Sequence, residues 1–115
     1  MTSGNWIKEF NGAITVCDRN GIILEMNDKA GKTFSKSGGT GLIGKSLLEC
    51  HPEPARSKLV KMLETGGTNS YTIEKNGIKK LIHQAPWHEN GQYMGLVELS
   101  IEIPVEMAHF IRKNQ

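Results

Sequence analysis

The fold is decided by residues 11–30, which read NGAITVCDRNGIILEMNDKA. Two segments rich in Ile, Val, Leu and Thr, 13–17 and 22–26, lie on either side of Asn20-Gly21. Asn-Gly favours the left-handed backbone of a tight turn whose twist matches that of paired strands. The stretch therefore predicts a β-hairpin.

Two further Asn-Gly pairs, Asn76-Gly77 and Asn90-Gly91, separate strand-like segments later in the chain. Together the three pairs predict three hairpins that use five strands. The last strand, 93–103, alternates apolar and polar residues with a period of two, and Pro104 ends it. We expect its apolar residues to face the core and its polar residues to face water. The apolar set is Val97, Leu99, Ile101 and Ile103, and the polar set is Glu98, Ser100 and Glu102.

The apolar spacing changes between the two groups of strands. Over 55–65 it becomes that of an amphipathic helix, with prolines before it and glycines after it. Its apolar face consists of Leu59, Val60, Met62 and Leu63. Shorter helices or turns are expected at 3–10, 27–33, 46–50 and 105–112. In the first of these, Ser3 is the cap, and Trp6, Ile7 and Phe10 share one side. This order predicts an α+β fold, a five-stranded antiparallel sheet with helices packed over one face.

Length and composition limit the function classes. With 115 residues the chain suits one domain, 1–115, with its core at 5–103 and a C-terminal extension at 104–115. The net charge of +2 is too balanced for a nucleic-acid-binding surface. Two distant cysteines without a CxxC pair fit a reducing compartment. We expect a cytoplasmic protein, because the sequence has no signal peptide and no apolar run that spans a bilayer.

The sequence resembles the PAS family at three places in order. Residues 11–30 resemble the opening PAS hairpin with its Asp, its turn, and the Asn and Ala that start the first helix. Residues 42–46, LIGKS, resemble the Ile-Gly-Lys/Arg segment, and residues 84–97 resemble the last PAS hairpin with its Pro, Asn-Gly turn and Gly-Val. The resemblance covers about residues 5–103. It implies a sensory or signalling module with a cavity between the helices and the inner face of the sheet. It also implies a domain that commonly forms dimers and relays a change to an output protein.

The pocket candidates follow from that cavity, and plain core packing is the alternative for each. They are Leu24, Phe34, Leu47, Leu48, Leu59, Met62, Leu63, Ile73, Ile82, His83, Gln84, Val97 and Leu99. Either His83 or Gln84, depending on the strand register, is expected to face the cavity, where it could bind a ligand carboxylate. Because few charged residues fall on these faces, we expect an apolar or modestly polar ligand. We assign structural roles to Asp18, which accepts backbone N–H groups across its turn, and Asn27, which caps the next helix.

The histidines and cysteines give little evidence of chemistry. His51, beside Cys50, is the candidate haem ligand, against a helix-entry turn in which Cys50 packs as an apolar residue. No metal site with zinc spacing and no catalytic motif in its required context is present. We therefore expect no enzyme, no assigned metal, and a cofactor that the sequence leaves unknown.

Three functions remain open at this point. The first is a PAS sensor that binds a small molecule or partner protein and relays the change through dimer contacts. The second is a ligand-free protein-interaction scaffold of the same fold, and the third is a small enzyme built on Cys50, His51 or His83. Trp6, Ile7 and Phe10 would be costly to expose, so we expect them to pack on the back of the sheet or against a second copy, and the expected assembly is a homodimer.

Overall fold

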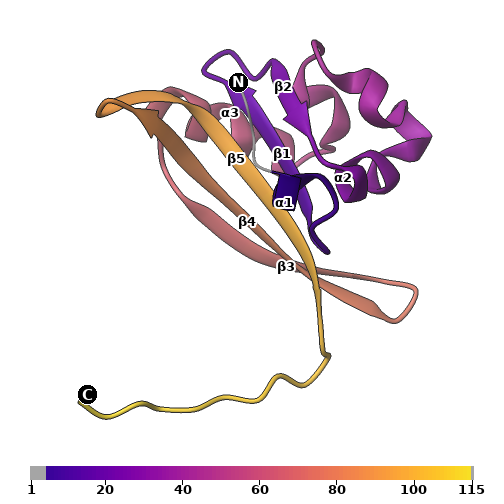
Figure 1. Cartoon of the computed structure of the whole chain (residues 1–115), viewed down its shortest axis with the longest axis vertical. Helices are drawn as coiled ribbons and strands as arrows, with labels where there is room; N and C mark the ends of the chain where they lie inside the picture. Colours follow the sequence, from indigo (N-terminus) through magenta and orange to yellow (C-terminus); the bar gives the residue numbers. More distant parts are fainter. Residues whose placement is uncertain (1–4, 115) are drawn as a thin grey trace.

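One antiparallel sheet organises the molecule, and the computed structural model describes it within residues 5–114 (Figure 1). Its strands are β1 (Ala13–Asp18), β2 (Ile23–Met26), β3 (Asn69–Lys75), β4 (Ile78–Glu89) and β5 (Gln92–Ile103), in the order β2-β1-β5-β4-β3. The helices are α1 (Asn5–Lys8), α2 (Asp28–Thr33) and α3 (Ala55–Thr65). Three 3₁₀ turns are η1 (Ser35–Ser37), η2 (Gly39–Leu42) and η3 (Leu47–Cys50). The predicted α+β fold is confirmed.

The hairpin turns form where the Asn-Gly pairs predict them. Asn76 and Asn90 have φ angles of 53° and 52°, and the glycine after each is also left-handed. In the first hairpin only Gly21 has a positive φ, and a side chain helps to close the turn. As predicted, Asp18 accepts hydrogen bonds from two backbone N–H groups, at 2.9 Å from Asn20 and 3.0 Å from Ile22.

Helix α3 has the predicted bounds. Leu59, Met62 and Leu63 are buried, whereas Val60, which we expected on the same face, is 37% exposed. The helix ends at Gly66, which adopts the left-handed conformation (φ 71°) and donates its N–H to the Met62 carbonyl at 2.7 Å.

Asn27 ties three segments together. Its side-chain oxygen accepts from the N–H of Ala30, which caps α2, and from the N–H of Ile14 at the start of β1. Its amide nitrogen donates to the carbonyls of Gly12 at 2.8 Å and Ile7 at 3.0 Å. The predicted cap is confirmed, and it also anchors α1.

The two faces of β5 are the reverse of what the alternation predicted. Glu98 pairs with Thr15 on β1 and with Gln84 on β4, and all three are buried on the face that carries the helices. Val97 and Leu99 lie on the other face, where they are only half-buried. The polar residue is inside because the helical side of the domain supplies a hydrogen-bonding partner for it.

Of the helices expected at the two ends of the chain, the structure contains, within residues 5–114, the N-terminal one and not the C-terminal one. Helix α1 lies in front of the sheet in Figure 1, on the side opposite α3, and its Trp6 ring meets Phe10 edge to face at 5.9 Å. The Ser3 cap falls outside the described residues. Residues 105–114 extend away from the domain without helical turns (Figure 1), so the helix predicted at 105–112 is wrong. A short helix without a packing surface is not stable in water.

None of the helices within residues 5–114 is long and apolar enough to cross a membrane.

Candidate functional site

A chain of polar side chains begins just after η3 and crosses the sheet; His51, Glu98 and Gln84 in it are buried, and Asn69 is half-buried. Nε2 of His51 lies 2.8 Å from Oε2 of Glu98, and both side chains are at least nine-tenths buried. The same carboxylate oxygen accepts from Nε2 of Gln84 at 2.7 Å. The Oε1 atom of Gln84 accepts in turn from Nδ2 of Asn69, at 3.3 Å. We call His51, Glu98, Gln84 and Asn69 the buried polar chain.

The hydrogen bonds of His51 define its protonation. Nδ1 lies 3.0 Å from the carbonyl oxygen of Leu47, which can only accept, so Nδ1 carries a proton. When His51 is protonated, Nε2 donates to the Glu98 carboxylate and the two side chains form a buried ion pair. Burial lowers the pKa of His51. The hydrogen bond and negative charge of Glu98, with the Leu47 carbonyl, outweigh that effect and raise the pKa above its usual value.

The buried polar chain ends at a pocket of about 380 Å³ between the start of α3 and β3. We call it the β3 pocket. Gln84 and Asn69 lie at its inner end, and the charged side chains Glu53 and Lys58 are exposed at its rim. The other lining residues are Pro52, Pro54, Ala55, Ser70, Tyr71 and Ile73. Burial, and then the charge of Glu98, raise the pKa of the Tyr71 hydroxyl, so this phenol stays neutral at physiological pH.

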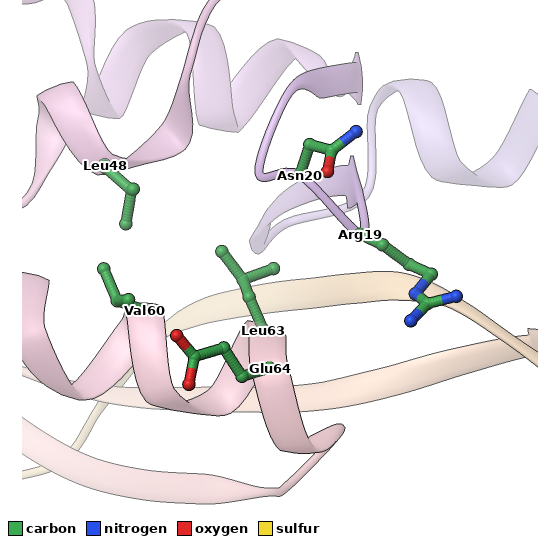
Figure 2. A pocket seen from close by; sticks show the side chains of 6 residues that line it. All are labelled: Arg19, Asn20, Leu48, Val60, Leu63 and Glu64. Atoms are coloured by element: carbon green, nitrogen blue, oxygen red, sulfur yellow. The ribbon is translucent and has the colours of Figure 1, made fainter.

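A second hollow of about 470 Å³ lies between η3, the β1–β2 turn and α3 (Figure 2). Leu48, Val60 and Leu63 form its apolar part, and Figure 2 shows the Leu48 and Val60 side chains directed toward one another. The Arg19 side chain points out of the hollow in Figure 2, and its guanidinium lies 5.4 Å from the centre of the Tyr93 ring. No buried polar side chain lines this hollow, so it offers less specificity than the β3 pocket.

The structure separates the predicted pocket residues into three groups. Most belong to the core or pack against it, namely Phe34, Leu47, Leu48, Leu59, Met62, Leu63 and Ile82. Ile73 and Gln84 line the β3 pocket. Four are not on the helix side of the sheet, which corrects their predicted position, namely Leu24, His83, Val97 and Leu99.

The strand geometry explains two of these corrections. His83 and Gln84 are adjacent in β4, so only one faces inward, and it is Gln84. His83 faces outward and bonds the Ser70 hydroxyl at 2.6 Å. Leu24 is the extra residue of a β-bulge in β2, and it is 45% exposed.

Sequence reasoning missed Glu98, Asn69 and Tyr71. The alternation of Glu98 with Val97 and Leu99 predicts that Glu98 faces water, whereas the structure buries it. The signal in the sequence that could have indicated its burial is the position of this carboxylate in the middle of an apolar strand. The partner that explains it, His51, is 47 residues away in sequence.

The arrangement does not activate Cys50 or free His51 for a metal. Both ring nitrogens of His51 already have partners, so neither is open to a haem iron. Burial and neighbouring carboxylates raise the pKa of the Cys50 thiol, which is the wrong direction for a nucleophile. Within residues 5–114, no three His, Cys, Asp or Glu side chains gather as metal ligands would.

Known proteins resemble the chain in structure only. No family model and no curated protein matches the sequence. The PAS domain of the histidine kinase ThkA superimposes with a TM-score of 0.61 at 19% identity, over 78% of this chain and 97% of that domain. VqmA from Vibrio cholerae gives 0.65 at 16% identity, over 96% of this chain and 56% of that one. The Aer2 receptor from Vibrio cholerae, a dual PAS–haem oxygen sensor, gives 0.57 at 18%, over 81% and 95%. At these identities the likeness establishes the fold alone.

Proposed function

We propose that this domain of PAS-like fold is a sensory module that binds a small molecule in the β3 pocket and relays binding to a second copy of the chain. The observation that carries the proposal is the buried polar chain, which begins at the pocket and ends at His51, just after η3. Buried polar groups cost more free energy than apolar ones of similar volume unless every partner is in place. A role in sensing what the pocket holds accounts for their presence.

The relay uses the two faces of β5. Glu98 belongs to the buried polar chain, and its neighbours Val97 and Leu99 lie on the opposite, outer face of the sheet. A ligand that moves Gln84 pulls on Glu98 and thereby shifts the outer-face residues beside it. The strand is therefore shared by the pocket and the outer face.

The outer face is the surface we propose for the second copy. Its half-buried apolar residues are Ile14, Leu81, Ala85, Trp87, Val97, Leu99 and Ile101. Trp6 and Phe10, 66% and 41% exposed, extend this surface at α1. Apolar patches of this kind are costly in water, and two-fold dimers are the usual way to cover them.

Native mass spectrometry and an absorption spectrum of the purified protein test this function. A retained small-molecule mass, or a cofactor band, is the expected result. A colourless dimer that retains nothing, and that binds nothing from a chemically diverse mixture of metabolites, would overturn the sensor function.

A ligand-free interaction scaffold is the second candidate, favoured by the apolar outer face together with a pocket that is open at its rim. The two candidates differ in whether the dimer depends on a bound molecule. A scaffold keeps the same dimerisation constant after the protein is unfolded, dialysed and refolded. A sensor changes its dimerisation constant when it loses its ligand.

A further inference from the structure

Two polar side chains of the β3 pocket, Asn69 and Tyr71, have hydrogen-bonding atoms that a ligand could use. Asn69 uses one N–H to bond Gln84. Among residues 5–114, nothing bonds its Oδ1 atom or the hydroxyl of Tyr71. Both ends of the Gln84 amide are bonded within the protein, because its nitrogen donates to Glu98 and its oxygen accepts from Asn69. Asn69 therefore keeps one acceptor, Oδ1, and one Nδ2–H donor for a ligand.

The walls of the pocket favour a flat apolar body. Pro52, Pro54 and Ala55 come from the entry to α3, and Tyr71 and Ile73 come from β3. Tyr71 and the proline rings supply broad surfaces against which a planar ring packs. Burial of such a ring is the main source of affinity in a small pocket.

The two charged side chains at the rim, Glu53 and Lys58, are exposed and have opposite signs, so together they favour neither an anion nor a cation. Glu53 at the rim already accepts hydrogen bonds from Ser57, at 3.0 Å from its N–H and 2.8 Å from its hydroxyl. Glu98 lies behind Gln84, and burial together with the negative charge of Glu98 raises the pKa of the Tyr71 hydroxyl. The same charge would repel an anion bound at Asn69. A cation there would have to leave water for two neutral oxygen atoms, Oδ1 of Asn69 and the Tyr71 hydroxyl, because the Glu98 carboxylate is already bonded by His51 and Gln84.

We infer that the β3 pocket binds a small, uncharged, planar molecule with an amide-type edge, a primary carboxamide or a ring lactam, which forms a paired donor–acceptor contact with Asn69. This inference rests on the proposed function and specifies its ligand class. The ligand's carbonyl oxygen accepts from the remaining Nδ2–H of Asn69, and its N–H donates to Oδ1. The bond from Asn69 to Gln84 then couples the ligand to the buried polar chain.

Three compounds of the same shape test the inference: benzamide, benzoate and benzamidine, which are neutral, negative and positive. Binding is followed in amide ¹H–¹⁵N spectra through Ala55, Tyr71 and the Asn69 side chain. We expect benzamide to shift these resonances. The dissociation constants of benzoate and benzamidine should be at least about tenfold higher than that of benzamide. In Asn69→Asp, benzamidine should bind more tightly than benzamide. The new carboxylate pairs in bidentate fashion with the amidinium and no longer donates to a carbonyl. Asn20→Asp, an exposed control in the second hollow, should leave the wild-type order unchanged.

The ligand class is overturned if benzoate or benzamidine binds the wild-type pocket as tightly as benzamide. It is also overturned if Asn69→Asp keeps the wild-type order, or if none of the three shifts these resonances at millimolar concentration. The proposed function is judged separately by the retained-mass measurement, which assumes no ligand class. A retained carboxylic acid, for instance, would support the sensor and refute the amide-type ligand.

Discussion

The imidazole of His51 and the carboxylate of Glu98 meet at 2.8 Å in the interior, one supplied by the residue that caps the C-terminal end of η3 and the other by the central part of β5. This contact joins the helical layer to the sheet. It also makes the stability of the domain depend on protonation.

The first prediction concerns the pH dependence of stability. Because the folded-state pKa of His51 is raised, its stabilisation is fully present below the unfolded-state pKa of about 6.5. It is lost as the pH rises through the folded-state pKa. Urea unfolding should therefore show a free energy of unfolding that falls as the pH increases above about 6.5.

Glu98→Gln should change the sign of that dependence. Without the carboxylate, burial dominates and lowers the pKa of His51, so stability should rise with pH between about pH 5 and pH 7. At about pH 6 the variant should lose about 3 kcal/mol. His88→Gln, at an exposed site, serves as the control. Equal slopes in the wild type and Glu98→Gln would refute the role assigned to the pair.

Gly95→Ala should be among the most damaging small substitutions. A Cβ there would overlap the carbonyl oxygen of Cys17 and lie 2.8 Å from the Cα of Asp18, at a φ of 154°. We expect a loss of about 3 kcal/mol or more in the free energy of unfolding. Gly91→Ala is the matched control, because its φ is also positive but no atom lies within 4 Å. It should cost about 1–2 kcal/mol, and similar costs for both would contradict the packing argument.

Asn27→Ala should separate a buried anchor from a surface ion pair. It removes the α2 cap and leaves the Gly12 carbonyl and the Ile14 N–H unpaired, at a cost of about 2–4 kcal/mol. Asp28→Asn, the next residue, breaks only the exposed contact to Lys8 and should cost less than about 1 kcal/mol. Thermal unfolding of the two variants measures this, and the reverse order would refute it.

Cysteine alkylation tests the remaining enzymatic hypothesis. Burial raises the pKa of Cys17 to about 11, and that of Cys50 is also raised. In native protein, iodoacetamide should modify Cys50 no faster than a small free thiol, and Cys17 more slowly still. Cys17→Ala and Cys50→Ser allow the two rates to be measured one at a time. A Cys50 rate well above that of a free thiol would revive a nucleophilic role.

Leu99→Lys tests the outer face. A charge in the middle of that surface should abolish the proposed dimer, and sedimentation velocity should show a monomer with unchanged circular dichroism. Val60→Lys adds the same charge on α3, on the other side of the molecule, at a site that is already 37% exposed. It should leave the dimer intact. If Leu99→Lys forms a dimer as tight as that of the wild type, the outer face is not the dimer surface and has no part in the relay.

The sequence predicts well what depends on neighbours along the chain. Asn76-Gly77 and Asn90-Gly91 specify turns by their own backbone preferences, and Pro54 and Gly66 mark the ends of α3. It predicts poorly what depends on distant partners. The alternation around Glu98 correctly gives two faces but not which one is inside, because His51 and Gln84 decide that. The helix predicted at 105–112 fails for the same reason, since nothing packs against it.

The reversed faces of β5 have a consequence for folding. A sheet in which β5 is offset by one residue would turn Val97 and Leu99 toward α3 and expose Glu98, which is the arrangement that hydrophobicity alone favours. Such an offset sheet would keep the same topology, so apolar burial and the buried hydrogen bonds of Glu98 favour different registers of β5. Offsetting the strand would bring Met94 or Leu96 to the point where Gly95 passes Cys17, and neither side chain can be accommodated. Gly95 thus selects the native register against the misregistered one.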